Sequence, residues 1–125
     1  MNLQVKLAKK IDLKSEELQL NRYRILFEKY GFPVSQIFVQ AVVRDGGTIA
    51  ATSRGITQNI YKIPIKRLED KDVLAFYDKL DCEVNCAFFT GRVRMCDDWE
   101  SWNGRRCNGY CDVSEVCKKL KARGR

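Results

Sequence analysis

The sequence lacks long apolar runs, and this absence excludes several classes of protein. No stretch of its 125 residues is long and apolar enough to span a bilayer, so we expect no membrane partner. The N-terminus has no apolar core and no cleavage site, and we therefore expect no secretory signal. Repeats and low-complexity linkers are absent as well, which favours one globular domain. The expected location is the cytoplasm or the nucleoid, or, for a viral source, the host cytoplasm or an assembled particle.

The sequence has fewer acidic than basic residues. Lys and Arg total 23 against 16 Asp and Glu, which gives a net charge of +7 and predicts a polyanionic partner, nucleic acid first and DNA favoured. Nine basic residues follow Gly91, and they alternate with aromatic residues that can stack on bases. The alternative is a solvated face with a basic tail. The residues are Arg92, Arg94, Arg105, Arg106, Lys118, Lys119, Lys121, Arg123 and Arg125, with the aromatic residues Trp99, Trp102 and Tyr110.

Four of the six cysteines gather within 22 residues, spaced C-x10-C-x3-C-x5-C. No regular helix or strand places all four on one face, whereas Gly104 and Gly109 let the backbone fold back. Because thiolates repel one another unless a cation binds them, we predict a structural metal centre, either an iron–sulfur cluster or zinc. Two disulfides in a secreted module are the alternative. The four candidate ligands are Cys96, Cys107, Cys111 and Cys117.

The remaining two cysteines lie outside this cluster. Cys82 and Cys86 are one helical turn apart in a predicted helix. Such a pair can bind metal, but we interpret both as small apolar residues in a second contact surface.

Periodicity predicts an α/β protein with one sheet and flanking helices. Strands are expected at 3–8, 34–44 (the candidate central strand) and 58–66, with a turn at 45–47 and a long hairpin connection up to Gly55. Helices are expected from an N-cap at Ser15 to Gly31, over 70–90, and from Val113 onward. We expect residues 1–91 to form the core, and 92–125 to form a cysteine segment and basic tail of the same domain.

Two helices carry informative stripes. In the helix expected from Ser15 to Gly31, one glutamine shares a helical face with aromatic and aliphatic residues. The residues of this face are Gln19, Tyr23, Leu26 and Tyr30. A half-buried amide needs a partner, so its role is either a hydrogen bond to backbone or a functional contact. In the long helix, seven apolar residues predict one buried face: Val73, Phe76, Tyr77, Leu80, Val84, Ala87 and Phe88.

The segment Gln19-Leu-Asn-Arg-Tyr23 resembles the Q-x3-Y motif of the RecB-like branch of the PD-(D/E)XK nucleases. This branch includes CRISPR-associated exonucleases and phage nucleases that carry a C-terminal cysteine cluster. Residues 106–117, with Tyr110-Cys111 and a trailing Cys117, are similar to that cluster, and 63–73 to the segment before it. The resemblance implies the C-terminal half of a restriction-endonuclease-like fold and favours a 4Fe–4S cluster. It also implies a set of nucleic-acid contacts, namely Gln19, Tyr23, Arg105, Arg106, Lys118 and Lys119.

The catalytic pattern of that family is incomplete here. It needs an Asp on one strand and (Asp/Glu)-x-Lys on the next, so that two carboxylates hold Mg²⁺ or Mn²⁺. The corresponding strand reads Gln4-Val5-Lys6, in which an amide replaces the carboxylate, and the strand with the other Asp would lie before Met1. Asp12-Leu13-Lys14 also spells the motif, but it stands too close to Gln19.

The expected function follows from this loss. We expect a nuclease-like, nucleic-acid-binding protein within a larger assembly, with Lys6 as a vestige. One alternative is half of a split metal-dependent nuclease, in which another chain supplies the carboxylates and Lys6 takes part in catalysis. The other is a structural or interaction protein that reuses the scaffold. Whether the chain is an enzyme stays open at this point.

Overall fold

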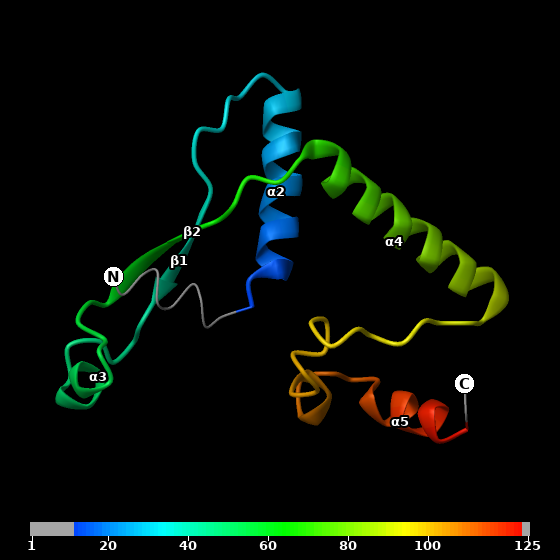
Figure 1. Cartoon of the computed structure of the whole chain (residues 1–125). Helices are drawn as coiled ribbons and strands as arrows, with labels where there is room; N and C mark the ends of the chain where they lie inside the picture. Colours follow the sequence, from blue (N-terminus) through cyan, green and yellow to red (C-terminus); the bar gives the residue numbers. More distant parts are fainter. Residues whose placement is uncertain (1–11, 124–125) are drawn as a thin grey trace. The chain divides into compact units, whose positions relative to one another are not determined.

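The computed structural model describes residues 12–123 (Figure 1). The chain divides into two compact units between Phe76 and Tyr77, inside a helix and upstream of the 91/92 boundary suggested by the sequence. The mixed α/β class is confirmed, whereas the strand predicted at 3–8, with Gln4 and Lys6, lies outside the described residues. The elements are α2 (Lys14–Lys29), β1 (Phe38–Val42), α3 (Ile49–Ser53), β2 (Ile60–Pro64), α4 (Asp70–Thr90), η1 (Arg106–Asn108) and α5 (Ser114–Ala122).

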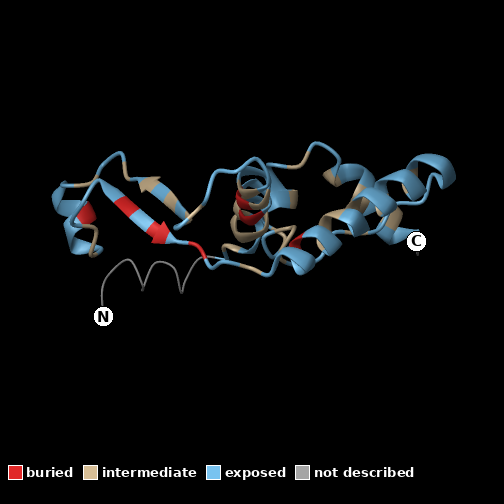
Figure 2. Ribbon diagram, turned by 90° about the horizontal axis from the view of Figure 1, so that it is seen from above, coloured by how far each residue is buried: buried red, intermediate tan, exposed pale blue. Residues whose placement is uncertain are grey.

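In the first unit, β1 and β2 form an antiparallel hairpin, as the sequence predicted. The register pairs Phe38 with Pro64 and Val42 with Ile60. Within the described part of the chain these are the two strands of the sheet, so the prediction of a central strand at 34–44 is wrong there. Both strands are also shorter than predicted, at five residues each. Burial alternates along β2, which Figure 2 shows as red and pale segments. The buried side chains are Tyr61 and Ile63, followed by Ile65 just after the strand. Pro64 ends β2, where its missing N–H costs little.

The connection between the strands is more ordered than predicted. The turn at 45–47 is confirmed, and Thr48 then caps α3, with its Oγ1 accepting a hydrogen bond from the Ala51 amide at 3.2 Å. Ala51 is buried. A side chain on Gly46 would collide with the side chain and backbone of Asn59, so the hairpin needs glycine there. Five residues are too few for a helical period to be visible in the sequence.

The helix α2 turns a polar face inward, which the sequence interpretation did not foresee. Its buried residues are Asn21 and Arg24, whereas Tyr23, Leu26 and Tyr30 of the predicted stripe are exposed. The predicted N-cap at Ser15 is also wrong. The helix begins at Lys14, after a cap residue that makes no side-chain hydrogen bond to it. Gly31, at φ +85°, ends the helix as predicted.

Asn21 explains part of this polar face, because every polar atom of its amide has a partner. Its Nδ2 donates to the Glu17 carbonyl at 2.8 Å and to the Lys66 carbonyl at 2.9 Å. Its Oδ1 accepts from the Leu68 amide at 3.0 Å and from Arg24 Nε at 3.3 Å. A fully buried amide is stable when it is fully bonded, and here it ties the link between β2 and α4 to α2.

Arg24 completes the same attachment. Its Nη2 donates to the Leu68 carbonyl at 3.0 Å and to Asp70 Oδ1 at 2.6 Å, and its Nη1 donates to Glu28 Oε2 at 2.8 Å. Burial disfavours the charge, but hydrogen bonds to Asp70 and Glu28 outweigh it and raise the pKa of Arg24. Glu28 also pairs with Arg67 at 2.8 Å, on the rim of this cluster.

The long helix α4 has the predicted bounds and ends at Gly91, which adopts φ +66°. Its apolar stripe is covered only in part. Val73 is buried and Phe76, Tyr77 and Leu80 are half-buried, while Val84 and Phe88 are exposed. Within residues 12–123, no helix is long and apolar enough to cross a membrane.

Candidate cysteine segment and nucleic-acid interface

The cysteine segment, residues 92–113 of the second unit, has almost no regular structure, as predicted. Its single short helix is η1. Three consecutive residues are left-handed: Trp102 at φ 52°, Asn103 at φ 54° and Gly104 at φ 86°. This run reverses the chain, and Gly104 takes the role that the sequence assigned to it. Gly109 is extended at φ 169°, a conformation open to any residue, so the fold-back does not depend on a glycine there.

Protein hydrogen bonds close this reversal. The Asn103 amide donates to the Asp98 carbonyl at 2.7 Å, and the Arg106 amide donates to the Ser101 carbonyl at 3.0 Å. The Gly104 amide donates to Ser101 Oγ at 3.2 Å. The turn is therefore fixed from both sides of the left-handed run.

Arg94 attaches the start of the segment to α4. Its Nε lies 2.8 Å from Glu83 Oε2, and its two Nη atoms contact the carboxylate of Glu100 at 2.7 and 2.8 Å. Glu100 in turn accepts a hydrogen bond from the Asp97 amide at 2.7 Å. Hydrogen bonds to Glu100 and then Glu83 raise the pKa of Arg94. The guanidinium of Arg94, one of the nine basic residues after Gly91, is therefore paired with carboxylates of the protein.

The thiols differ in exposure. Cys107 in η1, Cys111 just after it, and Cys117 in α5 are half-buried, while Cys96 is exposed. All six cysteines of the chain are free. Among residues 12–123, no three metal-binding side chains are arranged to hold an ion, so this arrangement does not by itself form the four-thiolate site. The metal centre stays a prediction.

Cys82 and Cys86 are both exposed on α4. No other described element covers them, and the interpretation that they belong to a second contact surface stays a prediction.

A second group of side chains belongs to the same segment as Cys107 and Cys111. The ring centroids of Trp102 and Tyr110 lie 5.7 Å apart at an interplanar angle of 57°. The guanidinium carbon of Arg106 lies 5.8 Å from the centre of the Trp102 ring. The two aromatic residues stay exposed, at 46% for Trp102 and 75% for Tyr110. We call these three side chains the aromatic platform.

The other predicted nucleic-acid contacts of this unit are at the surface. Arg105 is exposed beside the platform, and Lys118 and Lys119 are exposed on α5. Lys118 lies 3.5 Å from Glu115, in an ion pair open to solvent that costs little to break. Together with Arg106 they provide cationic groups within one unit.

The first unit holds the remaining predicted residues. Gln19 and Tyr23 are both on the exposed face of α2, and Gln19 Nε2 donates to the Tyr23 hydroxyl at 3.1 Å. The partner of the amide is therefore a side chain one turn away. Lys6 lies outside the described residues.

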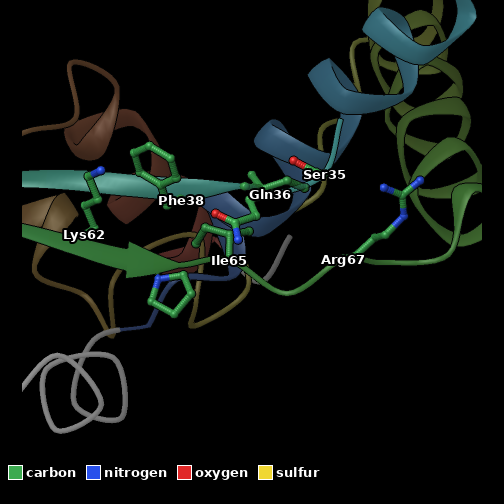
Figure 3. A pocket seen from close by; sticks show the side chains of 8 residues that line it. Ser35, Gln36, Phe38, Lys62, Ile65 and Arg67 are labelled. Atoms are coloured by element: carbon green, nitrogen blue, oxygen red, sulfur yellow. The ribbon is translucent and has the colours of Figure 1, made fainter. Parts of the chain in front are cut away.

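A hollow of about 430 Å³ opens beside the hairpin (Figure 3). Its charged groups already have partners. Lys62 Nζ lies 5.1 Å from the centre of the Phe38 ring, and Arg67 binds Glu28. Its lining includes the Ser35 hydroxyl and Lys62, but no carboxylate, histidine or cysteine stands there to activate the hydroxyl, and we assign it no chemistry.

Sequence reasoning missed the cluster of Asn21 and Arg24. Its one visible sign is the helical spacing of Asn21, Arg24 and Glu28, which places three hydrogen-bonding side chains on one face. The pairing of Trp102 with Tyr110 was missed too, because it depends on how the turn closes.

Comparison of the chain with protein families, with curated proteins and with solved structures finds no match in any of the three.

Proposed function

We propose that this protein binds nucleic acid as a relative of the RecB-like PD-(D/E)XK nucleases, works within a larger assembly, and lacks a complete active site of its own. The observation that carries the proposal is the exposed aromatic platform with cationic side chains beside it, in the same turn as Cys107 and Cys111. Aromatic faces next to Arg and Lys are typical of surfaces that bind nucleic acid.

The order of elements supports the family relationship. Gln19 and Tyr23 share the exposed face of a helix, and that helix is followed by a hairpin, a long helix and a cysteine segment. The three motifs of the resemblance, at 19–23, 63–73 and 106–117, follow one another in the same order along the chain. We propose that Gln19 and Tyr23 contact the sugar–phosphate backbone, as Arg105, Arg106, Lys118 and Lys119 do in the second unit.

We propose that the four cysteines hold a structural metal, with an iron–sulfur cluster favoured over zinc by the resemblance. Cys107, Cys111 and Cys117 are half-buried in one unit, which suits a structural centre. All four thiols have to come together when the metal binds, because among residues 12–123 no three metal-binding side chains are already grouped.

The metal is tested on protein isolated without oxygen. Iron, sulfide and zinc are measured in the natural chain and in Cys111→Ser, with Cys82→Ser as the control, because Cys82 is exposed on α4. We expect Cys111→Ser to lose metal and melt at a lower temperature, since metal binding and folding are coupled. Equal metal content in the two variants would contradict the centre.

Nucleic-acid binding is tested by fluorescence anisotropy with labelled DNA between roughly 50 and 200 mM salt. Affinity should fall steeply with salt, because each neutralised phosphate releases counterions. Arg105→Ala should reduce the slope by about one unit. Lys62→Ala is the matched control, since it removes a charge from the hairpin. A slope that Arg105→Ala leaves unchanged would count against the interface.

The same DNA with added Mg²⁺ or Mn²⁺ tests the active site. We expect no cleavage by this chain alone, and cleavage would overturn the missing-carboxylate argument. Cleavage that appears only with a co-purifying chain favours the split nuclease. Absence of both binding and cleavage favours the interaction protein.

The exposed apolar residues support a protein partner in the assembly. Phe27, Tyr30 and Phe32 are exposed in the first unit, and Phe88 and Phe89 are exposed in the second. Clusters of exposed aromatic side chains are common where another protein docks.

A further inference from the structure

We infer that the aromatic platform of Trp102, Tyr110 and Arg106 is a binding site for one unpaired nucleobase. The inference rests on the proposed function for the nucleic acid itself, and it names the part of the nucleic acid that this site takes. Phosphate contacts alone hold any strand, whereas a base can use an aromatic face only where it is not stacked within a duplex.

The geometry of the two rings leaves faces open. Their centroids lie 5.7 Å apart and their planes are tilted by 57°, so the rings touch without covering each other. Tyr110 is 75% exposed and Trp102 is 46% exposed, although Arg106 lies against the Trp102 ring. A buried structural cluster would hide these faces from water. Here they remain available to a flat, apolar ligand.

The backbone under Trp102 supports a functional reading. A bulky residue at φ 52° is an outlier, because its Cβ crowds the following carbonyl. Such strain persists where the surroundings impose it, and it concentrates at binding sites. The hydrogen bonds of Asn103 to Asp98 and of Arg106 to Ser101 impose it here.

These hydrogen bonds also prepare the site in advance. The Tyr110 amide donates to the Arg106 carbonyl at 3.0 Å, so the residues that carry the platform belong to one closed turn. A site that is already ordered loses less entropy when a ligand binds.

Charge selects the ligand. The guanidinium of Arg106 over Trp102 places a positive charge where a cationic ligand would have to approach, so it disfavours methylated lysine and similar cations. Arg105, next in sequence and exposed, can meet the phosphate of a bound nucleotide. The nearby acid Glu100 is paired with Arg94. A base attached to a phosphate satisfies both the rings and the charges.

The test compares three labelled probes of about 15 nucleotides each: an oligothymidylate, an abasic strand with the same phosphates, and a blunt duplex. The natural chain should bind oligothymidylate about 5- to 100-fold more tightly than the abasic strand. Tyr110→Leu should lower this ratio towards one while leaving the salt slope unchanged, because the ring contacts no phosphate. A Trp99→Phe background leaves Trp102 as the single tryptophan, and its fluorescence should change with oligothymidylate and not with the abasic strand.

Trp102→Gly is a second variant that removes a ring of the platform, and it serves to separate loss of binding from loss of folding. It removes the ring and also relieves the left-handed strain, so it should melt close to the natural chain and still lose the preference for bases.

The outcomes separate the inference from the proposed function. Equal, salt-dependent binding of all three probes would overturn the base site and leave the phosphate interface standing. The same conclusion follows if Trp102→Gly and Tyr110→Leu both keep the preference for oligothymidylate. Failure to bind any probe would overturn the proposed function and the base site together.

Discussion

Replacing Arg24 with alanine should weaken the first unit far more than replacing Arg67, although both bind the same carboxylate of Glu28. The side chain of Arg24 is 1% exposed, and its guanidinium reaches Asn21, Glu28, Leu68 and Asp70. The side chain of Arg67 is 56% exposed. The two variants therefore remove the same charge from very different surroundings.

The structure sets the expected size of the effect. Loss of Arg24 leaves the Leu68 carbonyl and the Asn21 amide oxygen each short of one partner, at a cost of about 1–3 kcal/mol for a buried polar group. The carboxylates of Asp70 and Glu28 are 58% and 25% exposed, so water can replace the arginine and their share is discounted. The guanidinium no longer has to be buried, which offsets part of the loss. We expect about 2–4 kcal/mol for Arg24→Ala, and about 0–1 kcal/mol for Arg67→Ala, a surface ion pair.

The assay has to report on the first unit alone. Both tryptophans, Trp99 and Trp102, belong to the second unit, so tryptophan fluorescence should respond little to either variant. Hydrogen exchange at the Leu68 amide, which donates to Asn21, follows the attachment itself, while far-ultraviolet circular dichroism in urea follows the helices of both units. Arg24→Met controls for the lost aliphatic stem. Equal destabilisation by Arg24→Ala and Arg67→Ala would refute the reasoning.

Two further predictions concern the same unit. Hydrogen bonds from Arg67 and then Arg24 hold the pKa of Glu28 below its ordinary value of 4.5, against the opposing effect of burial. Because the pKa is lower in the folded state, Glu28 contributes stability that is complete above about pH 4.5 and is lost as the pH falls through the folded-state pKa. Urea unfolding midpoints measured at decreasing pH should show this loss. The same dependence of the midpoint on pH in Glu28→Gln would contradict the prediction. Gly46→Ala should cost about 1–3 kcal/mol, because its Cβ would meet Asn59 Cα and the Gln58 carbonyl at 3.0 Å. Gly31→Ala meets no atom within 4 Å and carries only its left-handed strain, so thermal melting should rank Gly46→Ala as the less stable, and the reverse order would contradict the collision.

Long regular patterns were predictable from the sequence. The helix α4 has its predicted bounds because 21 residues of helical periodicity lie between acidic residues and a glycine. The inward side chains of β2 alternate as expected, since a strand with one buried face permits only one register.

The inward face of α2 was not predictable in this way. The apolar stripe of Tyr23 and Leu26 favoured burial of the wrong side of the helix. The actual face is decided by hydrogen bonds from Asn21 and Arg24 to Lys66 and Leu68, more than forty residues away in the sequence. No local pattern contains that information.

In the candidate site, too, some features were predictable from local sequence and others depend on tertiary contacts. Cysteine spacing located the segment, and the glycine at 104 indicated that the chain reverses there. The left-handed Trp102 could not be foreseen, because bulky residues almost never adopt this conformation without tertiary constraints. Its contact with Tyr110 follows from the closed turn, which sequence alone does not define.

The left-handed backbone at Trp102 makes the residue that suits thermal stability differ from the residue that suits binding of a base. A library randomised at this position and selected only for survival after heating should enrich glycine and asparagine, the residues that adopt positive φ most easily. The proteins recovered from that selection would fold without the indole side chain. The same library selected for retention on single-stranded DNA should keep tryptophan, and the divergence of the two pools would measure how far folding and recognition compete for one residue.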